Sequence, residues 1–295
     1  MATIYTHKDA NVRKTWLLMG LFLAVIVAIG WYLSYYYEDP GILYIAIIFS
    51  VVMNVTSYWY SDKISLSLAG AKPAQRESYP ELYRIAENLS ITAGLPIPRL
   101  YIINDAAPNA FATGRNKEHA AVAVTSGLLG IMDSNELSGV IAHELSHIGN
   151  RDTLLMTVVV VLVGFVSIVA DIFTRRAFFG RRDERSGGGI LAIVGLVLLI
   201  LSPVIAQLIQ LAISRKREFL ADADAALLTR YPEGLASALE KIGHYAEPMQ
   251  KANNATAHLF ISNPFGARSM RGLSKLFMTH PPIEERIQAL RAGER

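Results

Sequence analysis

The sequence contains no cysteine among its 295 residues. Thiolate metal ligands, disulfide bonds and a cysteine nucleophile are therefore excluded. Charge is also scarce: charged residues make up 18% of the chain, and the formal net charge is +3. So small a charge does not indicate a nucleic-acid partner, because basic residues beside membrane segments account for it. Apolar residues, by contrast, reach 52%, which is typical of a membrane protein with a substantial aqueous part.

The apolar residues are concentrated in four uncharged stretches, where crossing a bilayer takes about 20 such residues. These stretches are residues 15–37, 41–61, 153–170 and 186–214. Only Glu38, Asp39 and Pro40 separate the first two, which predicts a tight helical hairpin. The first stretch lacks the small-residue cleavage pattern of a signal peptide, so we expect it to remain as an anchor.

Basic residues indicate which side of the membrane the aqueous part occupies. They precede the first stretch and follow the second, whereas the turn at 38–40 is acidic. The positive-inside rule therefore places the N-terminus and the region after residue 62 in the cytoplasm. The segment 175–185 disagrees, because it carries five arginines where that topology requires an external loop. Either this loop is an exception, or the second pair of stretches enters the bilayer and returns without crossing.

The most informative motif is His-Glu-Leu-Ser-His at 143–147. On a helix, positions four apart lie one above the other, so His143 and His147 can bind one metal ion. Glu144 borders the same ion without binding it, as the general base of a zinc hydrolase does. Asp133 and Glu136 form a candidate capping box, and the apolar residues after them recur at helical spacing. The sequence therefore predicts a metal-binding helix packed into a core.

A zinc hydrolase usually takes three protein ligands and leaves the fourth position to water. Glu218 and Asp222 lie four residues apart after the last hydrophobic stretch. Glu218 is the candidate third ligand, and Asp222 is the candidate acceptor for the other ring nitrogen of a ligand histidine. The alternative is an ordinary charge cluster beside the membrane, since Arg215, Lys216 and Arg217 are adjacent. A membrane topology with two crossings or none between the motifs allows Glu218 to reach the histidines.

The aqueous part divides around the second pair of hydrophobic stretches. Residues 62–152 are predicted to form an α+β unit with a helix at 80–94 and strands at 99–104, 110–114 and 120–125. Residues 153–214 are the second hydrophobic pair, after the hairpin of 1–61. Residues 215–295 are predicted to form a mostly helical C-terminal part. A helix expected at 211–230 leads into this part from the fourth hydrophobic stretch. We expect the polar stretch near 250–274 to be mobile.

Over nearly its whole length, this ordered set of features resembles the HtpX family of bacterial membrane zinc metalloproteases, relatives of the CAAX prenyl proteases. The features that carry the resemblance are the hairpin, PNAFATG at 108–114, the motif at 143–147, the two later hydrophobic segments, Glu218 with Asp222, and His280-Pro281-Pro282 followed by Arg286. The resemblance implies zinc bound by His143, His147 and Glu218. It also implies a cytoplasmic active site and a role in the turnover of damaged membrane proteins.

Two further segments are candidate parts of the site, each with a structural alternative. In zincins an edge strand pairs with extended substrate, which makes Asn109 and Ala110 candidates for substrate binding; the alternative is a plain core strand. His280 is a candidate for stabilising the oxyanion of the tetrahedral intermediate. The alternative for His280 is a structural hydrogen bond, and Arg286 is then a charge that anchors its helix.

The sequence thus predicts a mostly α membrane protein with four hydrophobic helices and a cytoplasmic α+β zincin-like domain. The hypothesis for its function is a zinc-dependent endopeptidase of the bacterial inner membrane that cleaves misfolded or damaged membrane proteins, with one Zn²⁺ per chain and Glu144 as general base. Its partners would be polypeptides and the bilayer, without nucleic acid. The rivals are a non-enzymatic scaffold with a structural metal, and a protease that processes prenylated peptides.

Overall fold

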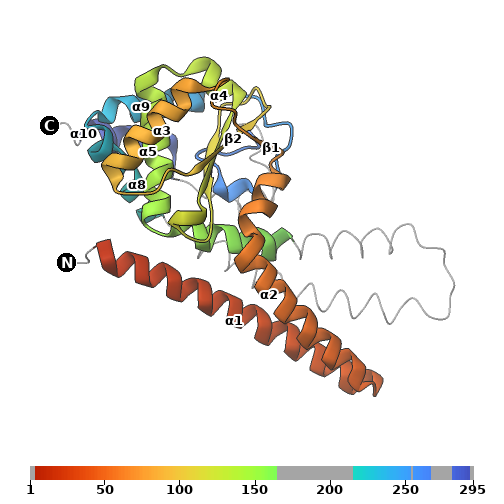
Figure 1. Ribbon diagram of the computed structural model, residues 1–295. Helices are drawn as coiled ribbons and strands as arrows, with labels where there is room; N and C mark the ends of the chain where they lie inside the picture. The colour runs from red at the N-terminus through yellow and green to blue at the C-terminus, as the bar shows by residue number, and fades with distance from the viewer. Residues whose placement is uncertain (1–3, 165–214, 254, 267–280, 293–295) are drawn as a thin grey trace.

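The computed structural model describes residues 4–164, 215–253, 255–266 and 281–292 (Figure 1). Its first two helices, α1 (Ile4–Tyr37) and α2 (Pro40–Leu68), form the antiparallel hairpin that the sequence predicts. The Asp39 side chain caps α2 by accepting a hydrogen bond from the Gly41 amide at 2.8 Å. At Gly30 the helices approach so closely that an added Cβ would lie 2.2 Å from the Ala46 Cβ. Only glycine fits there.

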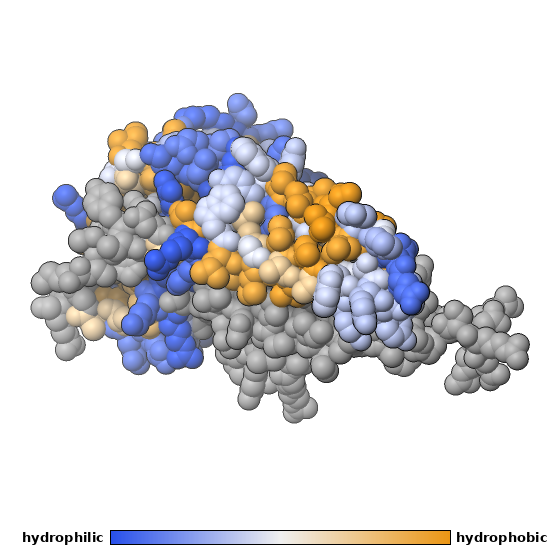
Figure 2. All heavy atoms as spheres, turned by 90° about the horizontal axis from the view of Figure 1, so that it is seen from below, coloured by the Kyte–Doolittle hydropathy of each residue, from blue (hydrophilic) through white to orange (hydrophobic). Residues whose placement is uncertain are grey.

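Both hairpin helices are long and apolar enough to cross a membrane, over Ala10–Tyr37 and Pro40–Leu68. Seen from the hairpin side, apolar side chains gather on this surface, as expected for a lipid-facing one (Figure 2). Helix α2 runs past Ser61, so it also enters the region predicted to be catalytic. Of the third hydrophobic stretch, the structure describes the part within a helix at Asp152–Gly164, bent by 84° from the helix before it. The fourth stretch lies outside the described residues.

A four-stranded sheet has the order β1-β2-β4-β3. Its strands are β1 (Ala71–Pro73), β2 (Arg99–Ile103), β3 (Ala110–Thr113) and β4 (Ala121–Thr125). β2 and β4 are parallel, whereas β1 pairs antiparallel with β2 and β3 pairs antiparallel with β4. β3 is therefore an edge strand, as its proposed role in substrate binding requires.

The other labelled helices contribute to the core on one face of this sheet (Figure 1). They are α3 (Pro80–Ala93), α4 (Ser126–Ile131), α5 (Ser134–Gly149), α8 (Arg215–Thr229), α9 (Pro232–His244) and α10 (Ile283–Ala292), with short 3₁₀ turns at Lys117–His119 and Ala257–Leu259. α5 packs against β3, α3, α8 and α9. At Gly139 an added Cβ would lie 2.6 Å from the Leu235 amide nitrogen, so glycine allows α5 and α9 this close approach.

Alternate residues of the strands contribute to two different cores. Leu100, Ile102, Val122 and Val124 belong to a core shared with α3, α5 and α9. Their neighbours in the strands, such as Ile103, Phe111 and Ala123, belong to a second core. That second core includes residues of α1, α2 and the helix Asp152–Gly164. The sheet is thus buried on both faces, because the hairpin end covers one of them.

Several local predictions are confirmed. The helix at 80–94 ends at Gly94, whose φ of +64° is the left-handed conformation that glycine favours. Asp133 and Glu136 form a complete capping box at the start of α5. The three predicted strands are present, while the short β1 was not foreseen. Of the polar stretch near 250–274, residues 255–260 are buried in the second core or beside it, whereas residues 254 and 267–274 lie outside the described residues.

Candidate metal centre

Helix α5 brings His143, Glu144 and His147 into the interior. Residues 139–148 of this helix are all buried, and each of the three functional side chains is at most 5% exposed. A helix that is buried all round must find partners for its polar groups. The two imidazole rings lie perpendicular, with centroids 4.8 Å apart, and their Nε2 atoms are 3.2 Å apart. The motif therefore forms a pair of nitrogen ligands that point to one place.

Helix α8 supplies a carboxylate to the same place. Glu218 is 5% exposed, and its carboxylate oxygens lie 3.9 Å from His143 Nε2 and 3.7 Å from His147 Nε2. His143, His147 and Glu218 are the described residues whose ligand atoms cluster closely enough to bind one metal ion. The structure thus brings together the three candidate ligands predicted from the sequence.

A carboxylate faces the Nδ1 atom of each histidine. Asp222 Oδ1 lies 2.9 Å from His143 Nδ1, which is the contact expected from the spacing of Glu218 and Asp222. Asp152 Oδ2 lies 3.1 Å from His147 Nδ1, and this second contact was not foreseen. The available signal was an acidic residue directly after the end of the motif helix. Each contact favours a proton on Nδ1 and leaves Nε2 as the ligand atom.

Arg286, on α10, holds the Asp222 carboxylate with two hydrogen bonds. Its Nε and Nη2 donate to Asp222 at 2.8 and 2.6 Å, and its Nη1 donates to the Ile261 carbonyl at 3.1 Å. The same Nη1 lies 3.8 Å from Glu218. Arg286 is fully buried, so it compensates the charge of carboxylates that are themselves buried. From sequence, only its presence in the ordered set of motifs marked it.

These contacts shift the pKa values of the metal-free site in opposite directions. Burial, together with the positive charge of Arg286, lowers the pKa of His143 to about 4. Burial opposes charge on His147 as well, but the hydrogen bond to Asp152 and the charge of Glu218 raise its pKa to about 9. Burial also disfavours the Asp222 carboxylate, yet Arg286 lowers its pKa to about 2. Since a metal needs both imidazoles neutral, His147 must lose its proton on binding.

Glu144 differs from the other carboxylates because one of its oxygens has no partner. Its Oε2 is buried without a hydrogen bond, while the Ala112 amide of β3 donates to the carboxylate. Burial is the largest cause that raises the pKa of Glu144, to about 7. A buried carboxylate with an unpartnered oxygen and a pKa near neutrality can take up and release a proton.

The arrangement fits zinc. In a tetrahedral site with Zn–N bonds of about 2.0–2.1 Å, neighbouring ligand atoms are roughly 3.3 Å apart, close to the 3.2 Å between the two Nε2 atoms. Two imidazoles and one carboxylate are the ligand set of several catalytic zinc sites. The unpartnered oxygen of Glu144 adds a proton acceptor that is not itself a ligand.

The other predicted site residues lie as follows. Asn109 is 2% exposed, and its side chain donates to the Ser262 carbonyl at 3.1 Å. The Ala110 carbonyl accepts a hydrogen bond from the Ile261 amide at 2.9 Å, so residues 261–262 cover this part of the β3 edge. His280 lies outside the described residues.

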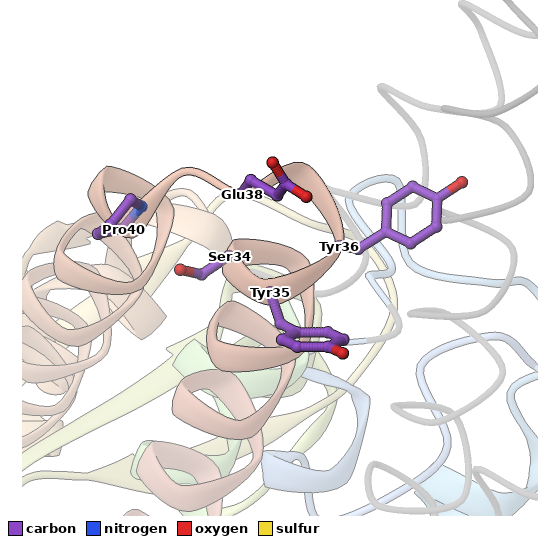
Figure 3. A pocket seen from close by; sticks show the side chains of 5 residues that line it. All are labelled: Ser34, Tyr35, Tyr36, Glu38 and Pro40. Carbon is purple, nitrogen blue, oxygen red and sulfur yellow. The ribbon is translucent and has the colours of Figure 1, made fainter.

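A separate pocket lies at the turn of the hairpin, lined by Ser34, Tyr35, Tyr36, Glu38 and Pro40 (Figure 3). Its side chains point in different directions, and it contains none of the predicted ligands. This pocket is therefore distinct from the metal centre.

Comparison with known proteins identifies the family. Residues 76–294 match the model of peptidase family M48. The chain belongs to this family. It is 48% identical to a protease HtpX homolog of Caldanaerobacter subterraneus subsp. tengcongensis, over 98% of each chain, and 47% identical to one of Pyrococcus furiosus, over 94% of each. The resemblance to the HtpX family is confirmed.

A solved structure shares the fold. The crystal structure of S. mikatae Ste24p has a TM-score of 0.51 to this chain at 19% identity. The match covers 97% of this chain and 66% of that one. Membership of family M48 makes the chain a metallopeptidase, a hydrolase of peptide bonds, and implies a divalent metal ion. The apolar hairpin makes it a membrane protein.

Proposed function

We propose that this M48 peptidase is a zinc-dependent endopeptidase that cleaves misfolded or damaged membrane proteins, with one Zn²⁺ per chain. The observation that carries the proposal is the buried cluster of His143, His147 and Glu218 beside the unpartnered oxygen of Glu144. His143, His147 and Glu218 would hold the ion, and Asp222 would orient His143. The catalytic unit would combine residues 62–152, which lie between the membrane segments 1–61 and 153–214, with residues 215–295, which follow the second segment.

Glu144 is the proton carrier of the proposed mechanism. When bound, zinc would polarise a water molecule and the scissile carbonyl, so that hydrolysis proceeds near neutral pH. Glu144 accepts the proton of the attacking water and delivers it to the leaving amine. Its raised pKa, about 7, suits both steps, because neither protonation state is strongly favoured. The Ala112 amide holds the carboxylate in place from the neighbouring strand.

The substrate would lie along the outer edge of β3. Asn109 and Ala110 lie at the start of β3, and the amide of Ala112, two positions further along, donates a hydrogen bond to Glu144. Pairing with Ala110 itself would require substrate to displace the Ile261 amide from its carbonyl. His280 would donate a hydrogen bond to the oxyanion, and we expect His280→Ala to lower kcat more than it raises KM.

The proposed location is the bacterial inner membrane, as a multi-pass protein with its active site on the cytoplasmic side. Exposed aromatic residues mark two levels on the hairpin: Trp16, Trp59 and Tyr60 near one end, and Trp31, Tyr35 and Tyr36 near the other. The 20 positions from Trp16 to Tyr36 rise about 30 Å along the helix, which is the thickness of the hydrocarbon core. The basic N-terminal end of α1 and the acidic turn agree with this orientation.

The metal centre lies close to the proposed membrane surface, which favours membrane-associated substrates. Asn11 of α1 donates a hydrogen bond to Asp152, the residue that faces His147. Asn11 precedes Trp16 by five positions, a rise of only about 8 Å along the helix. A polypeptide held at the headgroup level would thus be within reach of the ligands.

The deciding experiment compares Glu144→Gln with wild type in detergent. The variant should bind zinc and unfold at the wild-type temperature, but cleave an unfolded protein such as casein at least about 100-fold more slowly. Glu118→Gln, at an exposed position, is the control and should cleave normally. Cleavage by Glu144→Gln at the wild-type rate would contradict the mechanism.

The two rivals predict different results. A structural metal would need a fourth protein ligand, for which His280, His244 and Asp222 are the candidates. Asp222 faces Nδ1 of His143, and His244 is exposed and lies within hydrogen-bond distance of the Glu240 carbonyl. His280 lies outside the described residues. Chelator-sensitive cleavage by wild type would count against that rival. A prenyl-peptide protease should prefer a lipid-modified peptide, whereas we expect faster cleavage of a denatured membrane protein.

A further inference from the structure

We infer that the first membrane helix is part of the metal centre, with Asn11 as a positioning residue that acts on His147 through Asp152. The inference rests on the proposed function, because it concerns a metal ion bound by His143, His147 and Glu218. Its observations are independent of that proposal: a left-handed corner, a buried amide, and a carboxylate that contacts both this amide and His147.

The corner follows directly after the motif helix. α5 ends at Gly149, Arg151 has a φ of +58°, and the helix Asp152–Gly164 leaves at an angle of 84°. A residue with a side chain rarely takes a left-handed backbone, and it does so only where surrounding contacts hold it. This sharp turn places Asp152 beside His147, five positions back, with Oδ2 3.1 Å from Nδ1.

Asn11 holds the corner from a different part of the chain. It is 5% exposed, and its side-chain amide donates to Asp152 Oδ1 at 2.6 Å and to the Asn150 carbonyl at 3.2 Å. Arg217 lies farther from the same oxygen, at 3.5 Å. One amide group therefore contacts both the end of α5 and the carboxylate that faces a metal ligand. Since Asp152 shares its two oxygens between Asn11 and His147, the direction of the imidazole depends on α1.

An ordinary buried hydrogen bond that ties the hairpin to the peptidase part would have the same distances. The two roles differ in what changes when the bond is lost. A tether alone changes the unfolding temperature. A positioning residue also changes metal affinity and turnover, since partners of ligand histidines typically contribute 10–100-fold to metal affinity or activity.

The experiment uses the full-length protein in detergent and measures zinc affinity by competition with a chelator. Asn11→Ala should weaken zinc binding about 10-fold and lower kcat with little change in KM. Asn11→Asp keeps the side-chain shape but replaces the donor with a carboxylate beside Asp152, so its loss should be at least as large. Asn54→Ala is the matched control: it is a buried hairpin asparagine whose Oδ1 has no hydrogen-bond partner, and its zinc affinity should equal that of wild type.

A double-variant cycle tests the route. If Asn11 acts through Asp152, then Asn11→Ala should add little to the loss in Asp152→Asn. If Asn11→Ala is not recovered folded, Asn11→Ser retains a smaller donor and is judged by the same zinc criterion. Wild-type zinc affinity in the folded Asn11 variants, with only a lower unfolding temperature, would overturn the inference and leave the proposed function intact. Failure of the wild-type protein itself to bind zinc would overturn both.

Discussion

The two histidines of helix α5 have the same type of partner but different supports. His143 faces Asp222, which a fully buried arginine of α10 holds with two hydrogen bonds. His147 faces Asp152, which a neutral amide of the membrane hairpin holds, with Arg217 farther away. One ligand is thus supported from the core of the peptidase part, and the other from the membrane side.

Because of this difference, we expect the two supports to affect different properties: the stability of the fold on the core side and the metal centre on the membrane side. On the core side, Arg286 compensates the charge of a buried carboxylate, so loss of the arginine leaves Asp222 without its cationic partner. On the membrane side, the amide of Asn11 carries no charge, and its loss leaves Arg217 near the carboxylate. We therefore expect core-side changes to affect folding and membrane-side changes to affect mainly the metal centre.

The largest expected effect is that of Arg286→Met. Removal of one partner from a buried ion pair costs about 3–5 kcal/mol. Arg291→Met, on the same helix, is the matched control, because its ion pairs with Glu233 and Glu240 are partly exposed and such pairs contribute about 0–1 kcal/mol. Chemical unfolding of metal-free protein in detergent measures both. Equal losses in the two variants would contradict the expectation that the buried Arg286 stabilises the fold more than an exposed arginine of the same helix.

A smaller effect is expected from pH in the metal-free protein, with opposite signs on the two sides. In the folded protein the pKa of Asp222 is lowered to about 2. Its contribution to the free energy of unfolding is therefore present above pH 3.8 and is lost as pH falls through 2. The folded pKa of His147 is raised to about 9, so its contribution is present below pH 6.5 and is lost as pH rises through 9. That alkaline loss should be on the order of 1–3 kcal/mol.

The variant Asp152→Asn makes the pH test specific. Between the two limits, His143 and Glu144 titrate with opposite effects on stability and partly offset each other. Without the Asp152 carboxylate, the decline between pH 6.5 and 9 should shrink. The measurement is the free energy of unfolding of Asp152→Asn at each pH. If its decline at alkaline pH equals that of wild type, the pair of Asp152 and His147 does not produce the decline.

The smallest effect is expected at the corner itself. Arg151 holds a left-handed backbone that glycine adopts without strain. Arg151→Gly should therefore change the free energy of unfolding by less than about 1 kcal/mol, because relief of strain is offset by a more flexible unfolded chain. Zinc affinity should stay within twofold of wild type. A large loss of affinity would mean that the arginine side chain, rather than the turn, positions Asp152.

Much of the site could be predicted because its signals are local. His143, Glu144 and His147 lie within two turns of one helix, and Glu218 and Asp222 within two turns of another. Helix ends could be predicted for the same reason, as at the capping box of α5 and at Gly94. Strand β1 could not, since three residues carry too little pattern.

From local patterns alone, the sequence predicts the proposed chemistry of this protein: the candidate ligand types, the candidate general base, the absence of thiolates and the membrane hairpin. It does so because helical spacing and hydrophobic length are properties of short segments. The contact of Asp152 with His147, and the hydrogen bonds by which Arg286 and Asn11 hold the two carboxylates, depend instead on how the chain packs. Asn11 and Asp152 are 141 positions apart, so no local pattern relates them. Their contact exists because the sheet, the corner and the hairpin pack into one core.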